Sequence, residues 1–256
     1  MTKETKDYWD EASEDYQREC NIPIKIHYGP GAPFEDELNL LGNLRGKNVL
    51  EIGCGGAQCS IAMARQGAKV TGIDISERQL QFARTLAEKN GVIIKLYQGN
   101  IESFPQIRSN SQDLVFSAWA LFYVDNLESC FRETYRVLKK GGYFVASSIH
   151  PFFRIVDEKT LKIRESYFDV GKRTYSEVWK DGTKHYLEVY NRTVSDITNL
   201  LMDIGFSIER ILEPDSRRNY PENPWYNKFG CNPKIMSYVP PTIIFKAKKH
   251  LIKNDK

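Results

Sequence analysis

Residues 49–60, VLEIGCGGAQCS, place three glycines and two cysteines directly after an apolar run. Glycine lets the backbone approach a bound group closely, because it has no side chain in the way. Three kinds of ligand would suit these residue types: a phosphate on backbone N–H groups, a metal on the cysteines, or a ligand of another chemistry. The neighbouring residues decide between them.

The two cysteines of this turn do not form a zinc-binding pattern. Four residues separate Cys54 from Cys59, and no second Cys or His pair stands nearby at a zinc-like spacing. The five cysteines of the chain are scattered and odd in number, which is typical of a reducing compartment. We therefore expect both cysteines to be small packing residues, and we predict no metal.

A dinucleotide is the second candidate ligand. Its fingerprint is G-x-G-x-x-G, with an acidic residue about 20 positions further on. Gly53 and Gly55 fit, and Asp74 follows Gly55 by 19 positions, but Gln58 replaces the third glycine. Glu51 adds a negative charge beside the turn, which would repel a pyrophosphate and would suit a ligand with a cationic amine.

The elements around this turn alternate between apolar runs and amphipathic segments, a pattern typical of a parallel sheet covered by helices. A capping box of Ser76 and Gln79 is expected to open one of the helices. The predicted strands lie at residues 48–54, 69–75, 93–100, 113–120, 143–149, 206–214 and 242–249. The predicted helices lie at 60–68, 77–91, 127–142 and 195–205, the third of them ending at paired glycines.

Residues 151–192 break this rhythm. A turn at Asp181-Gly182 is flanked by aromatic and charged residues, which predicts a β-hairpin. We therefore expect three parts: an N-terminal lid over residues 1–46, a core over 47–150 and 193–250, and an inserted substrate cap over 151–192.

Several segments stand in a fixed order along the chain. They are E-x-G-x-G after the first strand, an acidic residue closing the second, QGNIESFP, DLVFSAWALFYV, VLKKGGYFVASS and LLMDIGFSIERILEP, preceded by YWDEASEDY. Over roughly residues 7–248 this order resembles the class I S-adenosylmethionine-dependent methyltransferases, in particular their small-molecule, type 11-like members. The resemblance implies a Rossmann-like α/β fold with a seven-stranded, mostly parallel sheet, helices on both faces and an antiparallel last strand.

The resemblance also implies S-adenosylmethionine as cofactor, a ligand with an amino acid end and a ribose diol but no phosphate. Glu51 would be an indirect partner of the amino acid end, and Asp74 would bind the ribose. Asn100 stands where the family often has Asp, at the segment that meets the adenine. The cofactor-binding residues implied are Trp9, Tyr16, Glu51, Gly53, Gly55, Asp74, Ile75, Asn100, Ile101 and Ala118.

Methyl transfer from a sulfonium is an in-line displacement that needs alignment and, where necessary, removal of a proton. Tyr123 and His150 stand just beyond the fourth and fifth strands, where the substrate is expected. His150 is the candidate general base, because a neutral imidazole accepts a proton near neutral pH. The plainer alternative is a hydrogen-bonded histidine at the rim of the site.

The lid and cap are rich in aromatic residues, with two histidines among them. These side chains could form a pocket for an apolar or cationic amine substrate, or they could simply make the core of a small cap. They are Tyr28, Tyr175, Trp179, Tyr186, Tyr190, His27 and His185.

The predicted function is methyl transfer to O or N of a small molecule. A protein- or peptide-modifying methyltransferase and a non-catalytic S-adenosylmethionine-binding protein remain open as alternatives.

Nucleic acid is not expected as a partner, because SAWALFY replaces the Asn/Asp-Pro-Pro-aromatic motif, no Pro-Cys pair occurs, and the net charge is only +3. No segment approaches the roughly 18 apolar residues of a membrane span, so we expect a cytoplasmic protein. The sequence does not predict the oligomeric state.

Overall fold

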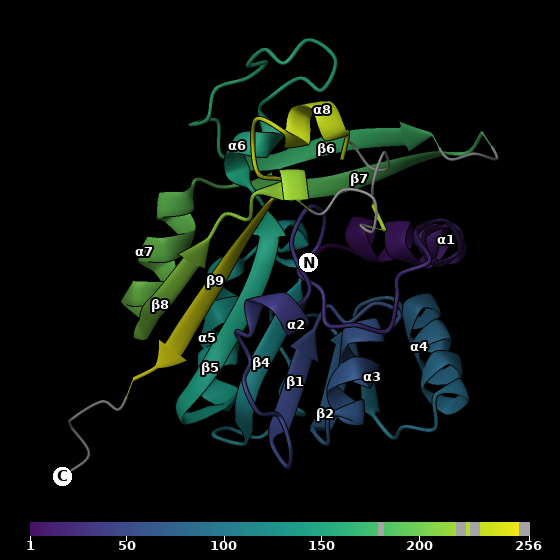
Figure 1. The fold of residues 1–256 in the computed structure, drawn as a ribbon, viewed down its shortest axis with the longest axis vertical. Coiled ribbons are helices and arrows are strands. Elements are labelled where there is room, and N and C mark those ends of the chain that lie inside the picture. The colour runs from purple at the N-terminus through teal and green to yellow at the C-terminus, as the bar shows by residue number, and fades with distance from the viewer. Residues whose placement is uncertain (179–181, 219–223, 226–230, 251–256) are drawn as a thin grey trace.

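A seven-stranded sheet organises the chain in the computed structural model, which describes residues 1–178, 182–218, 224–225 and 231–250 (Figure 1). The strands stand in the order β3-β2-β1-β4-β5-β9-β8. Strands β1 to β5 are parallel, whereas β9 is antiparallel to both β5 and β8. Their bounds are β1 Asn48–Ile52, β2 Lys69–Asp74, β3 Lys95–Gln98, β4 Gln112–Ala118, β5 Leu138–Ile149, β8 Phe206–Leu212 and β9 Thr242–Lys249. The predicted fold class is confirmed.

Two apolar layers hold the sheet between helices. Because side chains alternate along a strand, Leu50 and Ile52 of β1 join one layer and Val49 joins the other. The first layer includes side chains of α5 and α7, and the second includes side chains of α3. The longer helices are α1 Lys3–Cys20, α3 Gln58–Arg65, α4 Glu77–Lys89, α5 Leu127–Val137 and α7 Val194–Ile204. The short ones are α2 Glu35–Leu38, α6 Pro151–Arg154 and α8 Pro233–Met236.

The end of α5 corrects one sequence prediction. The helix was expected to run to the paired glycines at residue 142, but it ends at Val137, and β5 begins at Leu138. Leu138 has extended backbone angles and pairs with Gln112 at the start of β4. Residues from Leu138 onward, which helical periodicity assigns to α5, therefore belong to strand β5.

The inserted hairpin is present as predicted. Strand β6 (Gly171–Val178) pairs antiparallel with β7 (Lys184–Asn191), while Trp179 and the turn residue Asp181 lie outside the described residues. In Figure 1 the hairpin crosses above the carboxyl ends of the parallel strands, with α1 beside it. Helix α1 contacts both β7 and α4, so it spans the sheet edge where a site is expected.

The remainder of the expected lid packs differently from α1. Ile26, Tyr28 and Leu44 are buried against Val49 and Phe116 in the second apolar layer. This part of the N-terminal segment therefore belongs to the packing of the sheet, whereas α1 lies over its carboxyl edge. Within the described residues, none of the helices has the length and apolar character to cross a membrane.

Candidate active site

One cavity lies at the carboxyl ends of β1, β2 and β4 and is covered by α1 and β7. It has a volume of about 1210 Å³, part of which is open to solvent. Of the predicted site residues, it is lined by Trp9, Tyr16, Glu51, Gly53, Gly55, Asp74, Ile75, Ile101, Ala118 and Tyr123.

Asn100 does not line this cavity. Its Oδ1 accepts a hydrogen bond from the backbone N–H of Glu102 at 3.0 Å, and its Nδ2 donates to the carbonyl oxygen of Met1 at 3.2 Å. The side chain is thus turned toward the start of the chain. The structure does not bring Asn100 together with the other predicted residues, and its adenine role stays a prediction.

The glycine turn and the end of β2 are joined through Asp74. Its carboxylate accepts hydrogen bonds from the backbone N–H groups of Gly55 at 2.8 Å and Ser76 at 2.9 Å. Burial raises the pKa of Asp74 to about 6, although these two hydrogen bonds oppose the shift. Asp74 therefore presents a carboxylate to the cavity at neutral pH and shapes the turn beside it.

Gly53 occupies a position that only glycine fits. Its φ is +69°, and an added Cβ would lie 2.4 Å from the Cβ of Ala120 in the segment after β4. The turn after β1 can therefore approach β4 closely, which brings Gly53 and Ala118 to the same cavity.

Glu51 is a buried carboxyl with no cationic partner in the described residues. Only 2% of its surface is exposed, and the Ser60 hydroxyl donates to it. Burial raises the pKa of Glu51 to about 8, with a smaller contribution from the charge of Asp74. A cationic amine placed against Glu51 would favour its ionised form, so this side chain fits the amino acid end of S-adenosylmethionine.

Gln17 connects the covering helix to the glycine turn, a role that the sequence did not indicate. Its Nε2 donates to Oε1 of Gln79 at 2.8 Å, and its Oε1 accepts from Nε2 of Gln58 at 2.6 Å. Gln79 was expected to complete a capping box with Ser76. Ser76 does accept from the N–H of Gln79, but the Gln79 side chain bonds to Gln17 instead.

The cysteines of the turn are packing residues. Cys54 and Cys59 are both buried, and burial raises the pKa of both thiols, so neither is a reactive thiolate. The Cys59 sulfur accepts a hydrogen bond from the backbone N–H of His27 at 3.4 Å. Among the described residues, the structure contains no group of three or more side chains that could hold a metal ion.

Aromatic side chains form a large part of the cavity lining. Trp9 packs edge-on against Tyr16 and Tyr123, with ring centroids 5.1 and 5.5 Å apart. Trp225 donates from its indole nitrogen to the Tyr16 hydroxyl at 3.1 Å. Trp119, which the sequence reasoning missed, lines the same cavity and donates from its indole nitrogen to the Thr242 hydroxyl at 2.9 Å.

His150 lies outside the cavity lining. Its Nδ1 accepts from the backbone N–H of Phe152 at 3.1 Å, which caps α6, and its Nε2 lies 2.6 Å from a carboxylate oxygen of Glu213. Both ring nitrogens are therefore engaged. This geometry corresponds to the plainer alternative and does not support a role as base, which stays a prediction.

His27 is the histidine that lines the cavity. Within the described part of the chain neither of its ring nitrogens makes a hydrogen bond, and Nδ1 is shielded from solvent. Burial lowers the pKa of His27 to about 4, so the imidazole is neutral at physiological pH. From the sequence, His27 was predicted only as one of many aromatic residues in the lid, because its contacts, Cys59 and Trp225, lie far away in the chain.

Replacing Asp74 tests the link between the turn and the cofactor. We expect Asp74→Ala to weaken S-adenosylmethionine binding by at least ~10-fold, because two backbone N–H groups lose their charged acceptor. Asp113→Ala is a matched control, since Asp113 accepts from the backbone N–H of Asn48 at 2.8 Å at the opposite end of β1. Isothermal titration calorimetry measures both affinities. Equal affinities for the two variants would contradict the assignment.

Glu51 predicts a proton linkage. Below its folded pKa of about 8 the free side chain is protonated, and a cationic amine favours the carboxylate, so binding should release a proton. We expect the affinity for S-adenosylhomocysteine to rise severalfold from pH 7 to pH 8, a range above the pKa of Asp74. Calorimetry in buffers of different ionisation enthalpy counts the released proton. Glu51→Gln should abolish the release, and an unchanged release would refute the assignment.

Comparison with known proteins agrees with this geometry. Residues 50–146 match a family model described as a methyltransferase domain. An uncharacterized methyltransferase of Bacillus subtilis, YbaJ, is 30% identical over 177 residues, which cover 66% of this chain and 69% of that protein. A ubiquinone biosynthesis O-methyltransferase of Sodalis glossinidius is 37% identical over 109 residues, which cover 43% of this chain and 44% of that enzyme.

A solved structure extends the similarity to most of the fold. A Listeria monocytogenes protein described as a candidate S-adenosylmethionine-dependent methyltransferase superposes with a TM-score of 0.67 at 27% identity, covering 85% of this chain and 98% of that one. The family match includes β1, the glycine turn and β4, which form the base of the cavity. The chain belongs to the class I S-adenosylmethionine-dependent methyltransferases, and S-adenosylmethionine is its cofactor.

Proposed function

We propose that this enzyme methylates an oxygen or nitrogen atom of a small-molecule acceptor. The observation that carries the proposal is the continuity of the cavity: the glycine turn and the aromatic side chains line one space under α1 and β7. Trp119, Tyr123 and Leu187 are among the side chains that line it. A covered, aromatic-lined space suits a small acceptor better than a polymer, which needs an open groove.

The relatives support the same class of acceptor. The Sodalis enzyme is named for O-methylation in ubiquinone biosynthesis, which is chemistry on a small molecule. Because the matched region spans 44% of that enzyme, its own acceptor is not transferred to this chain.

Four side chains would bind the separate parts of the cofactor. Glu51 would hold the amino acid end, Asp74 the ribose hydroxyls, and Ile75 and Ile101 the adenine. When bound, S-adenosylmethionine supplies an electrophilic methyl group. The protein's contribution is alignment of the acceptor with that methyl group and exclusion of water by α1 and the hairpin.

His27 would accept the proton that the acceptor loses. A hydroxyl loses its proton as it takes the methyl group, and a protonated amine must lose one before it attacks. The neutral imidazole of His27 has unpaired nitrogens at the cavity to receive that proton. This assignment replaces His150 as the preferred base, because the His150 ring is bonded to Phe152 and Glu213.

A methyl-transfer screen tests the proposed function. The protein is incubated with S-adenosylmethionine labelled with tritium in the methyl group and with a cell extract, and small molecules are then separated from protein. We expect label in the small-molecule fraction and none with Asp74→Ala. Label in the protein fraction would indicate a protein- or peptide-modifying enzyme. Intact cofactor binding with no transfer would indicate a non-catalytic binder.

Paired histidine variants test the base. We expect His27→Phe to lower kcat on the acceptor found in the screen by roughly 10²-fold, because proton transfer loses its acceptor while the ring volume is kept. His150→Asn, which preserves an acceptor for capping α6, should remain close to the wild-type kcat. Unchanged turnover in His27→Phe would eliminate this residue, and a loss confined to His150→Asn would return the role to His150.

A further inference from the structure

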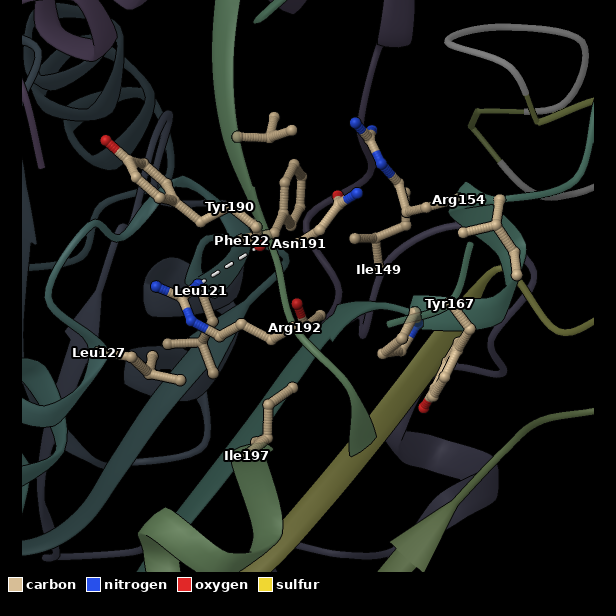
Figure 2. Close-up of a pocket in the computed structure, with 14 residues that line it drawn as sticks. Leu121, Phe122, Leu127, Ile149, Arg154, Tyr167, Tyr190, Asn191, Arg192 and Ile197 are labelled. Atoms are coloured by element: carbon tan, nitrogen blue, oxygen red, sulfur yellow. Dashed lines mark hydrogen bonds between the residues drawn. The ribbon is translucent and has the colours of Figure 1, made fainter. Parts of the chain in front are cut away.

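Arg154 lies where two cavities meet. It is the last residue of α6, and together with Phe122 and Ile149 it lines both the active-site cavity and a second, adjoining cavity (Figure 2). The second cavity has mainly apolar walls, including Leu121, Leu127 and Ile197. An acceptor bound in the active-site cavity would therefore have Arg154 and an apolar recess beside it.

The guanidinium of Arg154 makes no hydrogen bond with any residue that the structure describes. Its Nε and Nη2 are shielded from solvent and unpaired, while its planar group lies over the Tyr175 ring at 4.1 Å from the centroid. Shielding a cation without a hydrogen-bonding anion costs free energy. Stacking on an aromatic ring offsets only part of this cost, so Arg154 is prepared for an anionic partner.

The charged groups around Arg154 do not supply that partner. Arg164 donates to the main-chain oxygen of Arg154 at 2.7 Å, and its guanidinium lies 5.9 Å from the Tyr175 ring. The neighbouring carboxylate, Glu165, is paired with Arg164 at 3.5 Å and with Arg173 at 3.7 Å. Glu165 therefore already serves two other arginines, and no ion pair with Arg154 occurs among the described residues.

Arg192, the other arginine of the second cavity, is hydrogen-bonded to the main chain through both terminal nitrogens. It follows β7 and donates to the main-chain oxygens of Val124 at 2.5 Å, Asp125 at 2.9 Å and Tyr190 at 3.4 Å. Figure 2 draws Arg154 and Arg192 as side chains of separate segments, α6 and the end of the hairpin. The described lining therefore offers one unpaired cation, which matches a monoanion such as a carboxylate better than a phosphate dianion.

We propose that the methyl acceptor carries a carboxylate that Arg154 binds at the junction of the two cavities. This rests on the proposed small-molecule function. A planar guanidinium and a carboxylate form paired N–H···O bonds, which fix orientation as well as affinity. The positive charge of Arg154 disfavours a cationic amine substrate, which the aromatic residues alone would have allowed.

Matched pairs of small ligands test the proposal at equilibrium. Phenylacetate and 3-phenylpropionate are compared with their neutral amides, on protein saturated with S-adenosylhomocysteine, by ligand-observed NMR titration. We expect each carboxylate to bind at least ~10-fold more tightly than its amide, because the pair differs in the charge that Arg154 would meet. Equal affinities, or no detectable binding of either carboxylate, would overturn the proposal.

Variants assign the preference to one side chain. Arg154→Met should remove the discrimination between carboxylate and amide, and Arg154→Lys should keep part of it, since it preserves the charge without the planar fork. Arg173→Met is the matched control, because Arg173 belongs to the same region but lines neither cavity. Discrimination that persists in Arg154→Met would refute the proposal.

The readouts also separate this proposal from the proposed function. S-adenosylhomocysteine titration identifies the variants that are folded. If Arg154→Met does not fold, the carboxylate-to-amide discrimination of Arg154→Lys is compared with that of the wild type instead. Carboxylate preference without methyl transfer in the screen would leave the Arg154 site standing and remove the enzymatic proposal. Methyl transfer without carboxylate preference would leave the enzymatic proposal standing and remove the Arg154 site.

Discussion

The hydrogen bonds of Asp74 hold together the two strand ends on which the site is built. One carboxylate oxygen meets the N–H of Gly55 in the turn after β1, and the other meets the N–H of Ser76 at the start of α4. Backbone groups at the ends of parallel strands have no ladder partners of their own, so a side chain must satisfy them. The carboxylate thereby ties the turn after β1 to the end of β2, next to the backbone hydrogen bond from Gly53 to the Ile73 carbonyl oxygen at 2.8 Å.

The second requirement is a cover, and distant segments supply it. Helix α1, strand β7 and Trp225 come from opposite ends of the chain, yet they line one cavity with the glycine turn. Because the parallel strands end together, their loops alone would leave the site open on one side. The cover converts this edge into an enclosed space, and His27 and Arg154 line the same cavity.

Local patterns predicted the strands, the hairpin and the glycine turn, because these depend on residues that are neighbours in sequence. Glu51, Gly53 and Asp74 could be found in this way, since each stands at a fixed distance from a strand end. The predicted end of α5 was wrong, because the pairing of Leu138 with Gln112 overrode helical periodicity. The positions of Gln17, Trp119, His27 and Arg154 in the cavity could not be predicted, since each depends on contacts between segments far apart in the sequence.

The bonds between α1 and the glycine turn are of an uncharged kind. Gln17 meets Gln58 and Gln79 through amide groups, which neither titrate nor attract counterions. Dissolved salt screens ion pairs but acts little on hydrogen bonds between neutral amides. At this point the helix that covers the active site is therefore attached by contacts whose strength stays nearly constant across changes in ionic strength and acidity.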